Sequence, residues 1–189
     1  MTHPERPLRA DARRNRERLL EAALKAFSTE AATDVTLERV ARDAGVGIGT
    51  LYRHFPTREA LIEEVYRAEL ARLCDAVPRL LTQLPPVAAL RAWMDGFIDY
   101  MAAKHGLAEA LRTVIAAGGQ PFAHSRDRLV DAITRLQQAG AADGLRTDVA
   151  PLDVLVALSG ISLAAGEPDR RDQAGRLLDL LVDGLRARP

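Results

Sequence analysis

Hydrophobic residues recur along most of this chain at the spacing that places them on one face of an α-helix. Between residues 36 and 55 two such patterns follow one another closely. The first consists of Leu37, Val40, Ala41 and Ala44, at positions i, i+3, i+4 and i+7. The second repeats this spacing with Ile48, Leu51, Tyr52 and Phe55. The two patterns predict a pair of short helices.

The residues that flank these helices carry the signals of helix ends. Thr36 is suited to cap the first helix, because its hydroxyl can accept a bond from an unpaired backbone N–H. Gly45 follows the first pattern, and glycine adopts the left-handed conformation of a helix C-cap without strain. Pro56 disfavours helical backbone at the residue before it. The sequence therefore predicts a helix, a sharp turn and a second helix of about two turns.

Helical periodicity also covers the chain on either side of this pair. A first helix is expected at residues 11–29, and a long helix at residues 57–77, where Pro78 interrupts it. Five more helices are expected at residues 86–106, 107–118, 121–139, 152–164 and 174–185. No alternating β pattern of useful length is present. The prediction is an all-α fold of about nine helices, with three in a domain at 1–56 and the others in a domain at 57–189.

The second helix of the central pair has a face suited to DNA. Opposite its hydrophobic residues lie Gly49, Thr50, Arg53 and His54, which are small, hydroxylic or cationic. No acidic residue is among them. A helix, a glycine turn and a helix of this kind match a helix-turn-helix with an exposed recognition helix. On periodicity alone, two amphipathic helices of an ordinary bundle fit as well.

The overall charge does not identify a polyanionic partner. The 26 Lys and Arg residues balance the 26 Asp and Glu residues, so the formal net charge is zero. In the first 18 residues, however, six arginines outnumber three acidic residues. A short basic arm therefore leads into the helix-turn-helix. A DNA-binding protein with zero net charge must confine its basic residues locally.

The stretch from near Arg13 to Val65 resembles the DNA-binding domain of the TetR family of bacterial transcriptional regulators. The resemblance rests on Thr36, Val40, Ala41, the runs Ala44-Gly45-Val46 and Gly49-Thr50-Leu51-Tyr52, His54-Phe55 and Arg58-Glu59-Ala60-Leu61. It implies three helices in a DNA-binding head and about six in a body that binds a ligand and dimerises. The resemblance of the body is much looser than that of the head.

The resemblance also implies roles for individual residues of the head. Phosphate contacts are expected from Thr36, Thr50, Tyr52, His54 and Arg58. Base reading would fall to Arg53, which can donate two bonds to guanine, and to Gly47, Ile48 and Gly49. Ile48 and Tyr52 also lie on the hydrophobic face, so the core is an alternative place for both.

A homodimer that spans two half-sites of a pseudo-palindromic operator in double-stranded DNA is expected by the same resemblance. Its interface is expected in the helices at 152–164 and 170–185, because the first of these is apolar nearly all round. The alternative is that both helices pack only on the body of one chain.

A small-molecule effector is implied in a cavity of the helical body. The residues that could line it are Tyr66, Trp93, Phe97, Tyr100, Met101 and Phe122. Aromatic and methionine residues at helical spacing usually belong to the core instead. We expect a regulator, by analogy a repressor, that the effector releases from its operator. The alternative is an effector-independent DNA-binding or scaffold protein with the same head.

Other functional classes have no residues to support them. The four histidines lack metal-ligand spacing, and the sequence contains no HExxH, CxxC, phosphate-binding glycine loop or nucleophile elbow. We therefore expect no enzyme, metal or cofactor. The single Cys74 allows no internal disulfide, which fits a cytoplasmic protein, and no uncharged stretch is long enough to cross a membrane.

Overall fold

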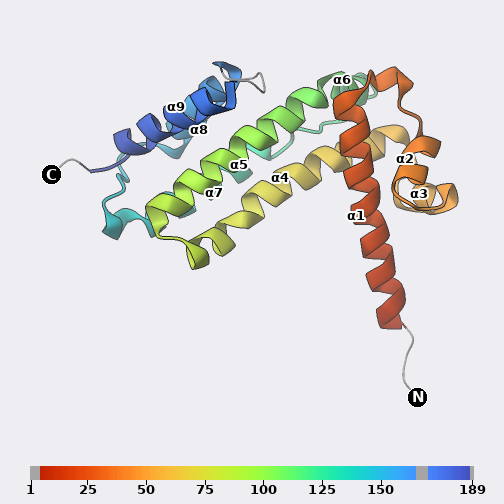
Figure 1. The fold of residues 1–189 in the computed structure, drawn as a ribbon, viewed down its shortest axis with the longest axis horizontal. Coiled ribbons are helices and arrows are strands. Elements are labelled where there is room, and N and C mark those ends of the chain that lie inside the picture. The colour runs from red at the N-terminus through yellow and green to blue at the C-terminus, as the bar shows by residue number, and fades with distance from the viewer. Residues whose placement is uncertain (1–4, 165–169, 188–189) are drawn as a thin grey trace. The chain divides into compact units, whose positions relative to one another are not determined.

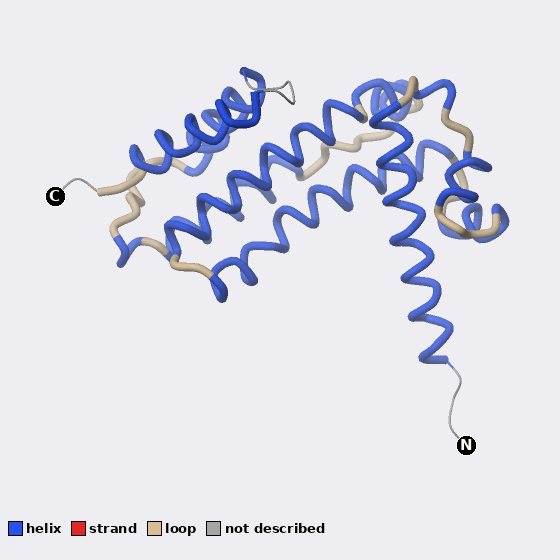
Figure 2. Tube along the Cα trace, viewed as in Figure 1, coloured by secondary structure: helices blue, strands red, loops and turns tan. Residues whose placement is uncertain are grey.

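The structure, a computed structural model, describes residues 5–164 and 170–187, without the side chains of residues 5–9 and 32. Within these residues it contains nine α-helices and no strand, which confirms the predicted all-α fold (Figure 1). The helices are α1 (Glu5–Thr29), α2 (Leu37–Asp43), α3 (Ile48–His54), α4 (Arg58–Gln83), α5 (Pro86–Gly106), α6 (Ala108–Ala116), α7 (Ser125–Ala139), α8 (Pro151–Ala164) and α9 (Arg171–Gly184). Short loops and two 3₁₀ turns, η1 (Ala32–Asp34) and η2 (Ala141–Asp143), complete the described chain (Figure 2).

The chain forms two compact units. The first comprises Met1–Ala68 and Ala103–Pro121, and the second comprises Glu69–Ala102 and Phe122–Pro189. Helices α4 and α5 therefore contribute residues to both units. The predicted division at residue 56 follows the helix-turn-helix instead, and it stays a prediction about function.

In the first unit, α1 packs against both helices of the helix-turn-helix, α2 and α3. The buried residues of α1 are all apolar and share one helix face: Leu19, Leu20, Ala23, Ala26 and Phe27. Val40 and Ala41 of α2, with Leu51 of α3, are also at most 2% exposed. This small core holds α3 in place.

The helix-turn-helix has the local structure that its sequence predicts. The Thr36 hydroxyl accepts a hydrogen bond from the backbone N–H of Arg39 at 3.2 Å, which caps α2. Gly45 has a φ of +63°, a left-handed conformation that costs a residue with a Cβ about 1–2 kcal/mol. Phe55, which follows α3, has extended backbone, as expected before Pro56.

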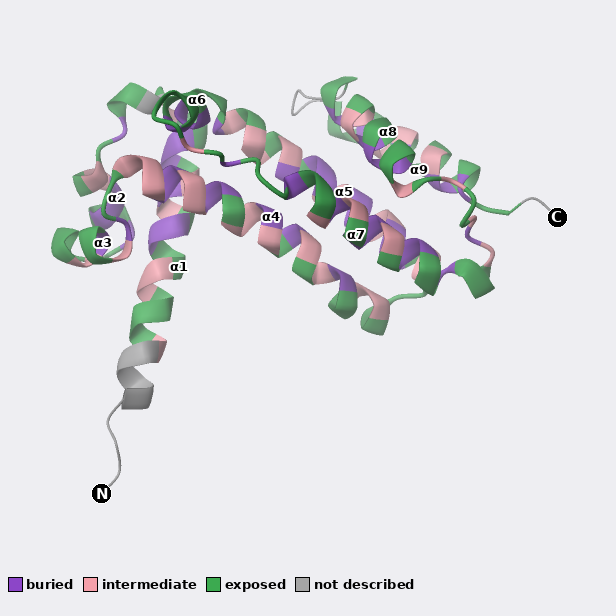
Figure 3. Cartoon of the chain, turned by 180° about the vertical axis from the view of Figure 1, so that it is seen from behind, coloured by how far each residue is buried: buried purple, intermediate pink, exposed green. Residues whose placement is uncertain are grey.

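In the second unit, α8 packs against both α7 and α9. Polar contacts join the other helices of this unit. The Arg91 guanidinium of α5 donates to the Asp179 carboxylate of α9 at 2.7 Å, and the Trp93 indole N–H of α5 donates to the Leu73 carbonyl of α4 at 3.1 Å. Figure 3 shows buried and exposed residues alternating along these helices, as amphipathic packing requires.

Three helix boundaries differ from the prediction by four residues or more. Helix α4 continues past Pro78, although proline lacks the N–H of a helical hydrogen bond. Val77 beside it is only 2% exposed, and tertiary packing of this kind outweighs a local preference. Helix α7 begins at Ser125 rather than near Pro121, because His124 has a left-handed φ of +63°. Helix α1 begins six residues before its predicted start.

Candidate nucleic-acid interface

The predicted recognition helix α3 is buried on one side and accessible on the other. Leu51 and Phe55 are 0% and 3% exposed, and they anchor the helix in the first unit. On the opposite side Gly49 and Arg53 are exposed and Thr50 is half-buried. A partner can therefore reach the face that the sequence predicts for DNA.

Two residues of the predicted hydrophobic face lie outside the core. Ile48 is 39% exposed and Tyr52 is 45% exposed, so their alternative assignment to the core is wrong. Tyr52 lies about 100° from Leu51 around the helix, at the edge of the buried face. Ile48 lies in the first turn, ahead of the buried residues. Both side chains are accessible to a partner that approaches α3.

Arg53 and Thr50, two predicted DNA contacts, interact with each other. The Arg53 Nη2 donates to the Thr50 hydroxyl oxygen at 2.7 Å, and its Nε donates to the Gly49 carbonyl at 3.3 Å. Hydrogen bonds on an exposed helix face contribute little net stability, because water can replace them. Arg53 is therefore held along the exposed face and can exchange these bonds for a base or a phosphate.

Gly47 and Gly49 have no structural need to be glycine in the folded protein. A Cβ added at either position would meet no heavy atom within 4 Å, and neither residue has a positive φ. Any small side chain would therefore fit the fold at these positions. The missing Cβ atoms leave the backbone at the start of α3 open to close approach by a partner.

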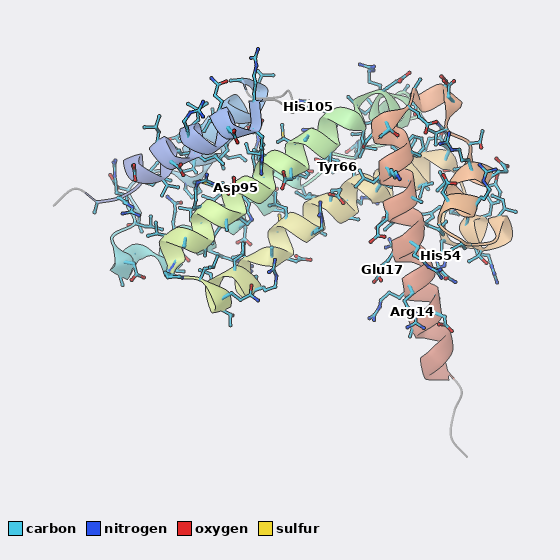
Figure 4. The ribbon with its side chains drawn as sticks, in the orientation of Figure 1. Arg14, Glu17, His54, Tyr66, Asp95 and His105 are labelled. Carbon is cyan, nitrogen blue, oxygen red and sulfur yellow. The ribbon has the colours of Figure 1, made fainter. Side chains whose placement is uncertain are left out.

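Thr36 and His54 lie at ends of the two helices. The Thr36 hydroxyl, which accepts the α2 capping bond, still carries a proton that it can donate to a phosphate oxygen. His54, labelled in Figure 4, is the half-buried last residue of α3. Its ring centre is 6.1 Å from that of Phe55.

Arg58 has contacts within the protein that the sequence did not predict. Its guanidinium donates to the Val35 carbonyl and lies 4.8 Å from the centre of the Phe27 ring. Both contacts stabilise the fold, the first as a charge-assisted hydrogen bond and the second as a cation–π interaction. Arg58 therefore joins the first turn of α4 to α1 and to the segment before α2, whatever it does with DNA.

Sequence reasoning did not single out Arg16, which also belongs to this region. The Arg16 guanidinium pairs with the Glu64 carboxylate of α4 and lies 5.6 Å from the centre of the Phe55 ring. It therefore fixes α1 beside the end of the recognition helix. In the sequence it is one of six arginines in the basic arm, and nothing there distinguishes it from the others.

The residues predicted to line a ligand cavity are distributed over both units. Tyr66 belongs to the first unit and is buried. In the second unit, Trp93, Phe97 and Tyr100 are buried and form a row, with neighbouring ring centres 6.1 Å and 6.0 Å apart. Met101 is half-buried. This row has the packing of a core.

The second unit also contains a pocket of about 260 Å³ between α4 and α5. Trp93 and Tyr100 line it, together with Leu73 and several charged residues. The charged residues are Glu69, Arg72, Arg79 and Asp99. Phe122 is not among the lining residues, and it is 40% exposed in the segment before α7.

Helix α8 buries one side and exposes apolar residues on the other. Val154, Leu155 and Leu158 are buried. Leu152, Val156 and Leu163 are 43%, 63% and 77% exposed, and their spacing places them on one stripe. Leu180 of α9 is a further large apolar residue, 68% exposed.

The part of the chain that the structure describes contains neither a metal-binding cluster nor a helix suited to span a membrane. No cluster of three or more His, Cys, Asp or Glu residues there could hold a metal ion. In the same residues, no helix is long and apolar enough to span a membrane. Cys74 is half-buried and donates from its sulfur to the Arg128 carbonyl at 3.7 Å.

Two family models match the chain. Residues 19–65 match the model of bacterial regulatory proteins of the tetR family. Residues 85–187, more than half of the chain, match the model of the C-terminal domain of SbtR-like transcriptional regulators. The chain belongs to the TetR family.

Solved TetR-family structures share the fold along nearly the whole chain. The TetR transcriptional regulator SCO0520 from Streptomyces coelicolor is 55% identical, with a TM-score of 0.86 over 92% of this chain and 99% of that one. A TetR regulatory protein from Mycobacterium vanbaalenii is 32% identical, with a TM-score of 0.77 over 96% of this chain and 100% of that one.

Curated HTH-type transcriptional regulators match a shorter part of the chain. An HTH-type transcriptional regulator of Staphylococcus aureus strain USA300 is 40% identical over 63 residues, which are 33% of this chain. The chain spans about a third of the length of the curated relatives it matches (34%). The protein is thus a TetR-family transcriptional regulator with a helix-turn-helix DNA-binding domain, in a family that is not enzymatic.

Proposed function

We propose that this regulator binds one operator sequence in duplex DNA with α3 in the major groove. The observation that carries the proposal is the accessible face of α3, where Arg53 lies beside Thr50. Arg53 donates to a guanine edge, and the exposed Ile48 contacts a base methyl group. Gly47 and Gly49 allow the backbone to come close to the DNA.

Phosphate contacts fix the position of α3 in this proposal. They come from Thr36, Thr50, Tyr52, His54 and Arg58. The exposed side chain of Tyr52 supports its role as a phosphate contact. Arg58 has a structural role as well, because it binds the Val35 carbonyl and contacts the Phe27 ring. Contacts of this kind hold the helix in register and carry no sequence information themselves.

The protein acts as a homodimer in this proposal, with its interface on α8 and α9. The apolar stripe of Leu152, Val156 and Leu163 supports this, because exposed apolar patches mark interaction surfaces. A two-fold dimer presents two copies of α3, so its operator is an inverted repeat with half-sites about 34–36 Å apart or a multiple of that distance. We place its action in the bacterial cytoplasm, where the DNA lies.

A small molecule in the second unit would release the regulator from its operator and so relieve repression. The pocket between α4 and α5, with Trp93 and Tyr100 in its wall, supports this part of the proposal. Its volume of about 260 Å³ is below the usual range of ligand pockets, about 300–1,000 Å³. That size favours the second candidate function, an effector-independent DNA-binding protein or scaffold with the same head.

Selection from a random duplex library by the purified full-length protein tests sequence-specific binding. We expect enrichment of one inverted repeat and tight binding of the enriched duplex at physiological salt. If no sequence is enriched and affinity depends only on salt concentration, binding is non-specific and the proposal fails.

A further inference from the structure

The N-terminal part of α1 extends beyond the core of the first unit. No residue from 10 to 18 is buried, and Leu19 is the first buried residue after them. In Figure 3 the described N-terminal turns of α1 are exposed or intermediate, and buried residues follow further along the helix. Apart from Arg16, which contacts Glu64 and the Phe55 ring, we therefore treat the segment as a surface that remains accessible.

The face of α1 that is apolar in the core becomes basic in this segment. At about 100° per residue, positions 6, 9, 13 and 16 lie on one side of the helix, close to the direction of Leu20 and Phe27. All four positions are arginines in the sequence. We call this set, Arg6, Arg9, Arg13 and Arg16, the arginine stripe. The same face thus changes from hydrophobic to cationic where the helix passes its last core contacts.

The arginine stripe begins beside the recognition helix. The Arg16 guanidinium lies over the ring of Phe55, the residue that follows α3, and pairs with Glu64. From position 16 to position 6 the helix rises about 15 Å, which corresponds to about four base pairs of duplex DNA. A duplex that occupies α3 and continues past its end would therefore meet the stripe.

Glu64 pairs with Arg16, but the other acidic residues near the stripe form only exposed pairs. Arg13 pairs with Glu17 at 3.6 Å, with the two side chains 76% and 59% exposed. On the other side of the helix, Asp11 pairs with Arg14, which Figure 4 labels. Exposed pairs of this kind are worth about 0–1 kcal/mol and exchange readily for other partners. Counting all of residues 5–18, six arginines stand against three acids.

We propose that the arginine stripe of α1 is a second DNA contact, which binds phosphates of the duplex flanking the sequence read by α3. This inference rests on the proposed DNA-binding function and adds sequence-independent contacts to it. Each arginine that pairs with a phosphate releases a counterion, so the stripe makes binding stronger and more dependent on salt. The occupant is duplex DNA because the stripe is cationic and continues from the predicted recognition helix.

The test compares two duplexes that carry the inverted repeat enriched by selection. One ends at the repeat, and the other extends about six base pairs beyond each end, which exceeds the reach of the stripe. The variant Arg9→Gln/Arg13→Gln removes two stripe charges and keeps residues with good helix propensity. The control variant Arg126→Gln/Arg135→Gln removes two exposed charges from α7, where Arg135 has a comparable pair with Asp131 at 3.0 Å.

We expect the wild-type protein to bind the extended duplex about tenfold or more tightly than the short one. The stripe variant should lose this advantage, and its slope of log K against log salt should fall by about 1.8 per protomer. The control variant should behave as wild type. Equal binding of the extended duplex by wild type and stripe variant, with equal slopes, would overturn the inference.

The other outcomes separate this inference from the proposed function. If the stripe variant weakens binding to both duplexes equally, the arginines do not contact flanking DNA, and the inference is wrong. If the wild-type protein binds no duplex at low salt, the DNA-binding proposal itself fails. Circular dichroism and a thermal melt of both variants establish that each is folded.

Discussion

At position 49 the protein carries no side chain, although the fold leaves room for one. We predict that Gly49→Ala stabilises the protein by about 0.5–1 kcal/mol, because alanine is a better helix residue and meets no neighbour within 4 Å. The same change should weaken binding to the enriched duplex by about tenfold or more, because the methyl group would obstruct a close contact. Thermal melting and fluorescence anisotropy measure the two effects.

Gly45→Ala is the contrasting change. Gly45 has a φ of +63°, so alanine there should destabilise the protein by about 1–2 kcal/mol. Unchanged DNA affinity in folded Gly49→Ala would show that the backbone at the start of α3 does not approach DNA closely.

Arg58 makes two contacts within the fold, and these lead to a second prediction for a single residue. Arg58→Ala removes the bond to the Val35 carbonyl and the contact with the Phe27 ring, and it should lower the free energy of unfolding by about 2 kcal/mol. Arg53→Ala, on an exposed face, should change it by less than about 0.5 kcal/mol. Urea unfolding of the two variants compares them, and equal stabilities would contradict the structural role of Arg58.

Cys74 should react slowly with alkylating agents. Burial raises the pKa of its thiol from the ordinary 9.0 to about 11, against a smaller opposing effect of Arg128. At pH 8 the thiolate fraction is then about a hundredfold lower than in an unfolded chain. Iodoacetamide should alkylate the native protein about a hundredfold more slowly than the protein unfolded in guanidinium chloride.

The same pKa shift fixes the sign of a pH effect on stability. The Cys74 thiol ionises at a lower pH in the unfolded chain than in the folded one, so the free energy of unfolding is unaffected below pH 9 and falls as the pH rises from about 9 to about 11.

For the alkylation experiment, equal rates in the native and unfolded states would show that the Cys74 thiol is exposed.

At the scale of the helices, α8 carries the prediction for assembly. Leu163→Lys places a charge on its exposed apolar stripe and should weaken the dimer by about a hundredfold, since Leu163 occurs twice in a two-fold interface. Analytical ultracentrifugation measures the dissociation constant. The control Leu84→Lys changes an exposed leucine outside α8 and α9 and should leave it unchanged. A Leu163→Lys protein that stays dimeric would place the interface elsewhere.

Helical periodicity predicted the existence of each helix, because apolar spacing follows directly from burial of one helix face. It failed where packing or a single backbone angle decided the outcome. Helix α4 continues past Pro78 because Val77 packs in the core. Helix α7 begins later than predicted because His124 has a left-handed backbone conformation. Neither effect is visible in a pattern of neighbouring residues.

The recognition helix shows the same limit for the candidate site. Periodicity placed Leu51 and Tyr52 on one face, but a helix wheel does not say how much of that face its neighbours cover. Only Leu51 is buried. The bonds of Arg53 to Thr50 could not be predicted either, because they depend on side-chain conformations.

At the scale of the whole molecule, the formal net charge of zero means that affinity for DNA must come from local surfaces. We propose that these surfaces are α3 and the arginine stripe of α1, each present twice in a dimer. Non-specific electrostatic attraction between DNA and the rest of the protein surface should therefore be weak. Sequence discrimination should depend on a few residues of α3.

The measurement that tests this account most directly is a fluorescence anisotropy titration of the enriched duplex and of a scrambled duplex with the same composition. Wild-type protein should bind the enriched duplex about 10³-fold or more tightly than the scrambled one. Arg53→Ala should remove about 1–3 kcal/mol of this discrimination per half-site, while Arg135→Ala should leave it intact. If Arg53→Ala discriminates between the duplexes as well as wild type does, α3 does not read the operator through Arg53, and the central claim is wrong.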